Sequence, residues 1–191
     1  MSSKLKLLNQ HGDTITLENS DLARGDRVID AGKLMASIDT ISALRLSTET
    51  PSTIYVTGYH TANDGAFGSN FFKWNSTSVE ADNSGTVIKL FGTTAGRYEL
   101  QYDGAVNVKW FGAVGDGSEC SDSIIQALAV TTSIFIPNGV YVLNKEIVLE
   151  GELLSKGSVS VIGETKTGTV LEFSGDTNGL SLLKRGISIS Q

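Results

Sequence analysis

The sequence predicts a mainly β protein in which an antiparallel β module precedes a run of short, repeating strands. Glycine is abundant at 21 residues and proline is rare at 2, a composition typical of β structure with many tight turns. Apolar and polar residues alternate with a period of two from residue 53 onward. From residue 146, short apolar strands recur about every 8 to 12 residues, which fits a sandwich, a barrel or a parallel β-solenoid.

The charge balance excludes some classes of partner. Lys and Arg number 15 against 21 Asp and Glu, a formal net charge of −6. Nucleic acids and anionic membranes require clustered basic charge, so we expect neither as a partner.

No apolar run approaches the roughly 20 residues of a membrane span, and residues 1–13 lack the apolar core of a signal peptide. Cys120 is the one cysteine, which permits no internal disulfide and suggests synthesis in a reducing cytoplasm.

The N-terminal region predicts one hairpin and one helix. Two short apolar runs within residues 4–17 flank His11–Asp13, which predicts a β-hairpin with this tripeptide in its turn. A helix is expected from about residue 31 to Leu46, because apolar residues recur there at helical spacing. Its apolar face consists of Ala31, Leu34, Ile38 and Ile41. Such a helix is marginal alone, so it must pack on the domain's own sheet or on copies of itself.

The antiparallel module is predicted to contain four strands. They are expected in residues 53–60, 70–75, 85–91 and 96–102. The segments between them are rich in Gly, Asn, Asp, Ser and Thr, which favour tight turns. Residues 106–111, VNVKWF, predict one more strand.

The C-terminal part predicts a short helix and then strands. Residues 121–129 have helical spacing, and a cap from Ser121 or Asp122 would stabilise the helix by about 1 kcal/mol. Two strands are expected around Pro137–Gly139. Further strands are expected in residues 146–151, 158–164, 169–175, 180–183 and 187–190. In a solenoid, residues 147–191 would supply about two rungs where about three are needed, so we expect part of a longer protein or a self-associating piece.

A glycine-rich loop, NVKWFGAVGDG at residues 107–117, lies where a phosphate-binding loop would lie, between a strand and a helix. No Lys-Ser or Lys-Thr pair closes the loop, and nearby carboxylates would repel a phosphate from the helix N-terminus. The other functional interpretation is a catalytic role for Asp116, but no histidine or second carboxylate is suitably spaced to act with it. We favour a structural turn, in which the glycines supply positive φ and the aspartate satisfies backbone donors. The residues of this turn are Gly112, Gly115, Asp116 and Gly117.

The same region resembles a known family. NVKWFGAVGDG, IIQALA and IFIPNGVYVL are similar, in this order, to the entry into the pectate-lyase-like right-handed β-helix of bacteriophage tailspikes. The matching positions are Val108–Gly117, Ile125–Leu128 and Phe135–Tyr141. Where the family usually has an aspartate pair before the helix, this sequence has Cys120 and Ser121.

The preceding region resembles the linker module that comes before tailspike β-helices. That module has a helix, a strand with Gly-Tyr, an Asp-Gly turn, an F-x-W strand and a strand with Gly-Arg-Trp. The corresponding residues here are Gly58-Tyr59, Asp64-Gly65, Phe72 and Trp74, and Gly96–Tyr98. Together the two resemblances cover about residues 41–143.

The resemblance implies a fold class and three domains. The fold would be mainly β, with a small N-terminal attachment segment and a short helix, an antiparallel β connector module, and the first rungs of a right-handed parallel β-helix. Residues 1–30 would be a virion-attachment segment, residues 31–106 the helix and connector, and residues 107–191 the entry and first rungs of the β-helix.

The resemblance also implies a function and partners. The chain would be a structural connector in the virion tail, with no catalytic residue, cofactor or metal of its own. It would form a homotrimer, and its N-terminus would bind phage tail or baseplate proteins and other tailspikes. Regions beyond this chain would bind or cleave host surface polysaccharide. The protein would be made in the host cytoplasm without a signal peptide and would act at the bacterial surface, without inserting into a membrane.

Two other functions stay open, a polysaccharide lyase or glycoside hydrolase and a carbohydrate-binding module. Paired carboxylates would serve hydrolysis, but a solvated rim is favoured for Glu150, Glu152, Glu164 and Glu172. Aromatic side chains could stack on sugars, but packing in the core or at a subunit interface is favoured. These aromatics are Phe71, Phe72, Trp74, Trp110 and Phe111.

Metal sites are the remaining candidates. His11 and His60 have no Cys or carboxylate at metal-ligand spacing. Asn63–Gly65 and Asp82–Gly85 contain oxygen ligands of the kind that calcium prefers, but neither fits the full calcium-loop pattern. Turns closed by their own side chains are the favoured interpretation of both segments.

Overall fold

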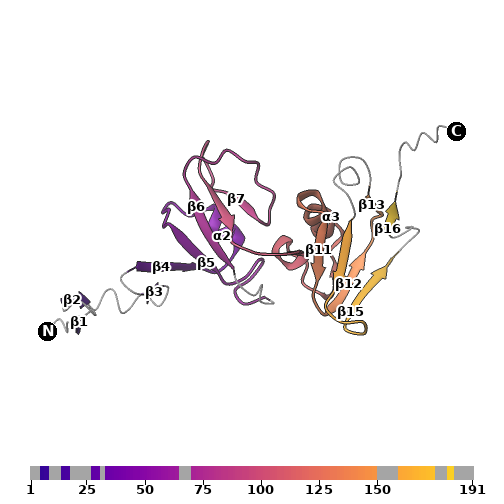
Figure 1. Cartoon of the computed structure of the whole chain (residues 1–191), viewed down its shortest axis with the longest axis horizontal. Helices are drawn as coiled ribbons and strands as arrows, with labels where there is room; N and C mark the ends of the chain where they lie inside the picture. The colour runs from indigo at the N-terminus through magenta and orange to yellow at the C-terminus, as the bar shows by residue number, and fades with distance from the viewer. Residues whose placement is uncertain are drawn as a thin grey trace.

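The computed structural model describes residues 5–8, 14–17, 27–30, 33–64, 70–149, 159–174 and 180–182. It confirms the mainly β fold class (Figure 1). A six-stranded sheet lies on the left of Figure 1, and a set of parallel sheets lies on the right.

The predicted N-terminal hairpin is present. Strand β1 (Leu5–Leu8) pairs antiparallel with β2 (Thr14–Leu17), and Leu5 lies opposite Leu17. Its expected turn at His11–Asp13 lies outside the described residues.

The six-stranded sheet contains the four strands predicted for the antiparallel module. Its order is β3-β4-β5-β6-β8-β7, and every neighbouring pair is antiparallel except β4 and β5, which are parallel. The strands are β3 (Arg27–Asp30), β4 (Lys33–Ile38), β5 (Thr53–Val56), β6 (Phe71–Asn75), β7 (Val87–Lys89) and β8 (Arg97–Leu100).

The helix expected from residue 31 to Leu46 is wrong over most of its length. Leu34 and Ile38 lie in strand β4, and of the predicted face only Ile41 lies in a helix, the short α2 (Ile41–Arg45). Ala31 lies outside the described residues. Strand β4 hydrogen-bonds to β3 on one side and β5 on the other, and this pairing overrides the local helical spacing.

Helix α2 begins where β4 has ended because Thr40 caps it. The Thr40 hydroxyl accepts a hydrogen bond from the backbone N–H of Ala43 at 3.0 Å. The helix buries Ile41 and Leu44 against the sheet, with exposed fractions of 4% and 0%. Packing rather than helix propensity therefore stabilises this single turn.

The C-terminal strands form a parallel β-solenoid, which decides among the three architectures left open by the sequence. The first sheet holds β9 (Val106–Asn107), β11 (Ser133–Ile136) and β14 (Ser160–Gly163). The second holds β10 (Asp116–Glu119), β12 (Gly139–Leu143) and β15 (Thr169–Phe173). The third holds β13 (Ile147–Leu149) and β16 (Leu180–Leu182).

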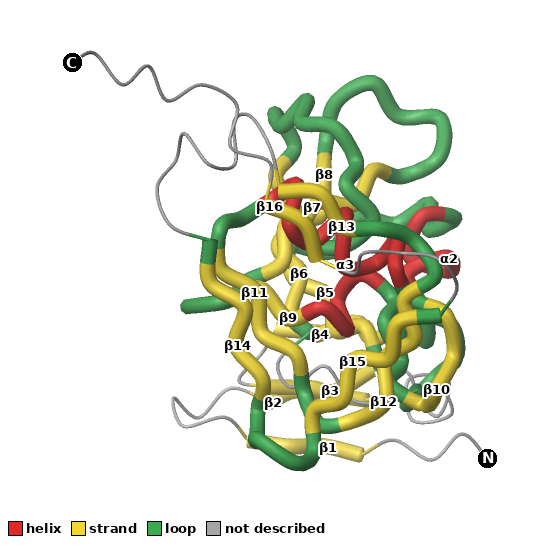
Figure 2. Tube along the Cα trace, turned by 90° about the vertical axis from the view of Figure 1, so that its right-hand side faces the viewer, coloured by secondary structure: helices red, strands yellow, loops and turns green. Residues whose placement is uncertain are grey.

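Each strand of one turn pairs in parallel with its counterpart in the next turn. Ser133 lies opposite Ser160, and Gly139 lies opposite Thr169. Figure 2 shows the strands of the successive turns lying beside one another. The solenoid starts at β9 and β10, which lie N-terminal to residues 147–191, the range in which the sequence predicted about two rungs. The strand expected in residues 187–190 lies outside the described residues.

The strand expected in residues 106–111 ends after Asn107. Val108–Phe111 forms a 3₁₀ helix, η1, whose N-terminus is capped by the Asn107 side chain accepting from Lys109 N at 2.9 Å. Successive residues of a strand face opposite sides, whereas Trp110 and Phe111 are both buried. The helical turn is what allows both aromatic rings to enter the core.

The predicted side-chain cap of the next helix is also wrong. Helix α3 (Ser121–Val130) has Cys120 at its N-cap position, without a side-chain cap hydrogen bond. The Glu119 carboxylate instead accepts from Ser121 N at 2.9 Å. The buried Ser121 hydroxyl accepts from Asn144 N at 3.0 Å, so this side chain joins the helix to the strand β12 end rather than capping the helix. Asp122 forms an exposed ion pair with Lys145 at 2.6 Å.

One hydrophobic core runs through both parts of the fold. Buried residues of the six-stranded sheet and α2 belong to the same cluster as those of η1, α3 and the solenoid. Examples from along the chain are Leu44, Phe72, Tyr98, Phe111, Ile124, Ile134 and Leu143. Among the described residues, no helix is long and apolar enough to cross a membrane.

Candidate functional site

The seam between the six-stranded sheet and the solenoid is the candidate functional site. We define the seam as residues 58–64, Gly85 and residues 108–113. The first two groups come from loops of the sheet, and the third is η1 with the start of the glycine-rich loop.

Gly85 lies directly against the Phe111 ring. A β-carbon at Gly85 would overlap three ring carbons of Phe111, so only glycine permits this approach. Both residues are buried, and Phe111 is 2% exposed. The loop before β7 is therefore packed tightly on the first turn of chain that leads into the solenoid.

Gly112 makes the second close contact of the seam. It ends η1 in the left-handed conformation, with φ 93°, and its N–H donates to Lys109 O at 3.0 Å. A β-carbon here would lie 2.7 Å from Tyr59 Cε1 and 3.0 Å from His60 Nε2. The His60 ring nitrogen Nε2 also hydrogen-bonds to Gly112 O at 2.9 Å, so the contact is polar as well as steric.

Asp64 fixes the loop that carries these two rings. Its carboxylate accepts from the backbone N–H groups of Tyr59, His60 and Thr61 at 2.9, 2.5 and 2.9 Å. Partial burial acts to raise the pKa of the Asp64 carboxyl, but the three backbone donors outweigh it and the pKa is lowered. The ionised side chain thus acts as a clamp for the loop, consistent with a turn closed by its own side chain.

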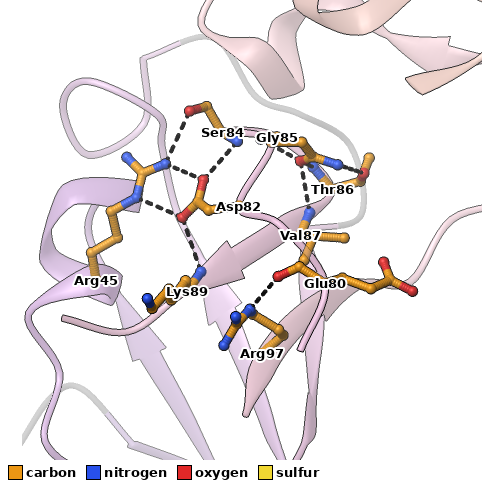
Figure 3. A network of polar contacts seen from close by, with 10 residues as sticks. Arg45, Glu80, Asp82, Ser84, Gly85, Thr86, Val87, Lys89 and Arg97 are labelled. Atoms are coloured by element: carbon orange, nitrogen blue, oxygen red, sulfur yellow. Dashed lines mark hydrogen bonds and ion pairs between the residues drawn. The ribbon is translucent and has the colours of Figure 1, made fainter. Parts of the chain in front are cut away.

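An ion pair holds the loop that carries Gly85 (Figure 3). Arg45, the last residue of α2, donates from Nε and Nη2 to the two carboxylate oxygens of Asp82 at 3.1 and 2.7 Å. Asp82 also accepts from the backbone N–H of Ser84 at 2.8 Å and of Lys89 at 2.9 Å. Burial acts to raise the pKa of the Asp82 carboxyl, but these donors outweigh it and hold the pKa below its usual value.

Asn83 completes the same loop. Its side-chain oxygen accepts from three consecutive backbone N–H groups, those of Gly85, Thr86 and Val87, at 3.1, 2.9 and 2.9 Å. The oxygens of Asp82 and Asn83 are thus engaged with protein donors, which fits the turn interpretation rather than a calcium loop. Buried Arg97 donates to Glu80 O and to Gly96 O and closes the start of the loop (Figure 3).

The glycine-rich loop contains three left-handed residues, one within the seam and two beyond it. Gly112, Gly115 and Gly117 have φ values of 93°, 82° and 90°. The Asp116 carboxylate accepts from Ser118 N at 3.0 Å and from Ser118 Oγ at 2.5 Å. Strand β10 starts at Asp116, so part of the expected loop is the first edge of the second parallel sheet.

Gly115 covers a buried tyrosine. A β-carbon at Gly115 would lie 2.8 Å from both Cζ and Oη of Tyr141, which is fully buried. The Tyr141 hydroxyl has no hydrogen-bond partner among the described residues, and burial raises its pKa to about 12. Burial likewise raises the pKa of the nearby Cys120 thiol to about 11. Neither group is poised for proton transfer or nucleophilic attack near neutral pH.

The aromatic candidates lie in the core or at its margin. Phe72 is buried, and half-buried Trp74 lies 4.9 Å from Tyr98, between ring centroids. Trp110 lies 4.9 Å from Tyr102 by the same measure. A cavity of about 10 Å³ between Phe72, Gly85 and Trp110 has room for about one water molecule and none for a sugar ring.

The remaining candidates that fall within the described residues do not converge on a site. Glu164 is exposed and accepts from Asn138 N at 2.7 Å, and Glu172 is exposed on β15. Glu150, Glu152 and His11 lie outside the described residues. In the part of the chain that the structure describes, no group of three or more His, Cys, Asp or Glu side chains could hold a metal ion.

Sequence reasoning missed how the seam is built. It singled out Gly112, but not its contact with Tyr59 and His60. It considered Asp64 as part of a linker-module turn or a calcium candidate, and Gly85 as part of a calcium candidate and at the start of an expected strand, but not their contacts at the seam. The one local signal was the Asp-Asn-Ser-Gly segment at residues 82–85, whose side chains favour tight turns. The partners across the seam are far apart in the sequence, so no local pattern indicates them.

Comparison with known proteins identifies both parts of the fold. Residues 37–103 match the family model of the phage tail protein small four-stranded β-sheet domain. This range contains α2, strands β5 to β8 of the six-stranded sheet and the Asp82 loop. No curated protein sequence matches the chain.

Solved structures of phage tailspikes share the fold. The enzymatically active domain of tailspike protein 2 of bacteriophage CBA120 matches over 77% of this chain with a TM-score of 0.60 and 18% identity. Full-length tailspike protein 2 from Escherichia coli O157:H7 bacteriophage CAB120 matches over 97%, with a TM-score of 0.53 and 16% identity. The tailspike of Acinetobacter baumannii bacteriophage Fri1, a capsular polysaccharide depolymerase, matches over 76%, with a TM-score of 0.50 and 13% identity.

These matches confirm, at the level of fold, the resemblance to the N-terminal part of phage tailspikes. The chain spans only part of the matched structures: 21%, 29% and 31% of their lengths, in the order given. At these identities the similarity shows a shared fold. The activities named for the matched proteins are statements about those proteins alone.

Proposed function

We propose that this chain is the structural connector of a trimeric phage tailspike, which links the virion tail to a β-helix that binds or degrades host polysaccharide. The observation that carries the proposal is the continuous core across the seam. A phage tail β-sheet domain and the first turns of a parallel β-helix share this core, instead of being joined by a flexible linker. A connector that must orient a distal receptor-binding part benefits from such rigidity.

The contacts of the seam support this role. Arg45 holds Asp82, whose loop presents Gly85 to the Phe111 ring. Asp64 holds the loop whose His60 bonds to Gly112 O. Two polar clamps therefore position two close-packed contacts, and both fall on the segment that leads into the solenoid.

We further propose the following division of labour along the chain. Residues 1–30 attach to tail or baseplate proteins and to other tailspikes, residues 31–106 form the connector, and residues 107–191 begin the β-helix. Host polysaccharide is bound or cleaved by regions beyond this chain. The protein is made in the host cytoplasm and resides in the virion tail.

We also propose that this chain does not catalyse polysaccharide cleavage by itself. Glycoside hydrolysis requires two carboxyl groups about 5 to 9.5 Å apart that flank the sugar. The ionisable groups at the glycine-rich loop serve turns and caps, since Asp116 accepts from Ser118 and Glu119 accepts from Ser121. These roles support a structural interpretation of the segment.

Labelling of virions tests the proposal. Gold-conjugated antibodies raised against the purified chain should label the tail in electron micrographs of the phage that carries it, and should not label the capsid. Labelling confined to the capsid would contradict the connector role. In parallel, the chain should release no oligosaccharide from bacterial capsular polysaccharides, and turnover by the chain alone would favour an enzyme instead.

A further inference from the structure

We propose that Asp82 and Asn83 form a plug that occupies the outer edge of strand β7 and prevents the sheets of neighbouring copies from joining strand to strand. The plug is defined as the side chains of these two residues together with the backbone N–H of Asn83. It is independent of the connector role, because a plugged edge has the same effect in any chain held close to copies of itself.

Strand β7 lies at the end of the six-stranded sheet, beside β8. A strand in this position presents a row of backbone N–H and C=O groups on its outer side, and these groups can pair with a strand of another chain. Such pairing joins the sheets of separate molecules. It is a particular hazard in an oligomer, where identical edges are held at high local concentration.

The register between β7 and β8 shows which backbone groups face outward. Leu100 N donates to Thr86 O at 2.8 Å, so these two residues form a hydrogen-bonded pair. Bonded and non-bonded pairs alternate along an antiparallel ladder, and Val87 and Lys89 therefore belong to non-bonded pairs. The N–H and C=O groups of Val87 and Lys89 point away from β8, toward the outer edge.

The plug meets these outward groups. Asn83 N donates to Val87 O at 3.1 Å, and the side-chain oxygen of Asn83 accepts from Val87 N at 2.9 Å. Opposite residues of two adjacent antiparallel strands exchange a pair of bonds in the same manner. Asp82 Oδ2 accepts from Lys89 N at 2.9 Å (Figure 3). These outward groups of β7 thus have partners within the chain and are not available to another strand.

The bond to Lys89 distinguishes the plug from an ordinary turn. A turn closed by its own side chains requires only bonds to the next few residues, such as those from Asn83 to the backbone as far as Val87. Asp82 instead reaches Lys89, seven positions further along the chain and the last residue of β7. The contacts therefore follow the strand from its first residue to its last.

The plug is held in place by the rest of the connector. Arg45 of α2 donates to both carboxylate oxygens of Asp82. Ser84 has a left-handed backbone, with φ 64°, and its N–H donates to the same carboxylate at 2.8 Å. The Asn83 side-chain oxygen also accepts from Thr86 N at 2.9 Å. An incoming strand would have to displace these bonds before it reached β7.

Removal of both side chains tests the plug. Asp82→Ala combined with Asn83→Ala is studied at temperatures where circular dichroism shows the full chain to be folded. Sedimentation velocity should then give a weight-average mass about twofold or more above that of the wild type, because pairing at the edge joins two assemblies. In dilute samples the Lys89 amide should exchange its hydrogen about tenfold or more faster than in the wild type. Asp122→Ala removes an exposed carboxylate from its ion pair with Lys145, and as the control it should change neither quantity.

Lys89→Pro in the same background separates edge pairing from a loosened loop. Proline removes the outward N–H and its ring blocks an approaching strand, while the bonds between β7 and β8 are kept. It restores no contact to the loop of residues 82–85. The mass should nevertheless return to the wild-type value, because the larger species form through β7. If the double alanine variant does not fold, Asp82→Ala alone keeps the turn bonds of Asn83 and is put through the same comparison.

Two results would overturn the plug. One is a folded alanine variant with the wild-type mass and slow exchange at Lys89. The other is a larger species that persists after Lys89→Pro, since it would arise from the loosened loop and not from the edge of β7. Neither result bears on the connector role, which the labelling of virions tests, and labelling confined to the capsid would leave the plug intact.

Discussion

Gly85 and Phe111, which belong to different halves of the fold, are packed so closely that a β-carbon at Gly85 would overlap the Phe111 ring. Gly85 lies in a loop of the region that matches the phage tail β-sheet domain model, and Phe111 ends the 3₁₀ helix that leads into the solenoid. This contact joins the six-stranded sheet to the solenoid through one shared core. Moving either residue away would open a gap in that buried core.

The first prediction concerns this contact. Gly85→Ala should lower the free energy of unfolding by about 1–3 kcal/mol, since the added methyl group forces the buried Phe111 ring to shift. Urea denaturation followed by circular dichroism measures the change. Phe111→Leu provides space, so the double variant should be more stable than the sum of the two single effects implies. Additive effects would show that the two residues do not press on one another.

The second prediction compares two glycines of the same loop. Gly115 and Gly117 both have positive φ, but a β-carbon at Gly117 meets no atom within 4 Å, whereas one at Gly115 meets Tyr141. Gly117→Ala should cost about 1–2 kcal/mol for the left-handed backbone alone. Gly115→Ala should cost about 1–3 kcal/mol more because of the clash. Equal losses in thermal or urea denaturation would remove the packing role assigned to Gly115.

The third prediction concerns acid stability. The pKa of Asp82 is lowered in the folded chain, so its ionised form contributes stability above the ordinary aspartate pKa of about 3.9. This contribution is lost as the pH falls through the lowered pKa. Asp82→Asn should therefore be less stable than wild type at pH 6, and the difference should shrink toward pH 2.5. Asp103→Asn, in an exposed loop, controls for the loss of one negative charge. A stability difference that does not change with pH would contradict the role of the ionised carboxylate.

The sequence predicted strands well where a single period dominates. The segments around β5, β6, β7 and β8 alternate with a period of two, and each contains the expected strand. It failed between residues 31 and 40, where Leu34, Ala36 and Ile38 fit a strand as well as a helix. The choice there depends on hydrogen bonds to β3 and β5, which local spacing does not reveal.

The glycine-rich loop is an example of seam contacts that could not be predicted from the sequence. Its composition predicted left-handed glycines, since few other residues adopt positive φ without strain. It did not predict that Gly112 would lie under Tyr59 and His60, or Gly115 over Tyr141. Those partners come from distant segments, and their positions follow from the packing of the whole core.

Distances between two spin labels test the central claim, that connector and β-helix form one rigid body. Lys73→Cys on β6 and Lys166→Cys on the solenoid are exposed attachment sites, and Cys120→Ala removes the one native thiol. Labelled chains are diluted with unlabelled chains so that each assembly carries one labelled copy. Double electron–electron resonance should then give a single narrow distance distribution, which Gly85→Leu should broaden. A broad or bimodal distribution in the chain without the Gly85 substitution would contradict the rigid connector.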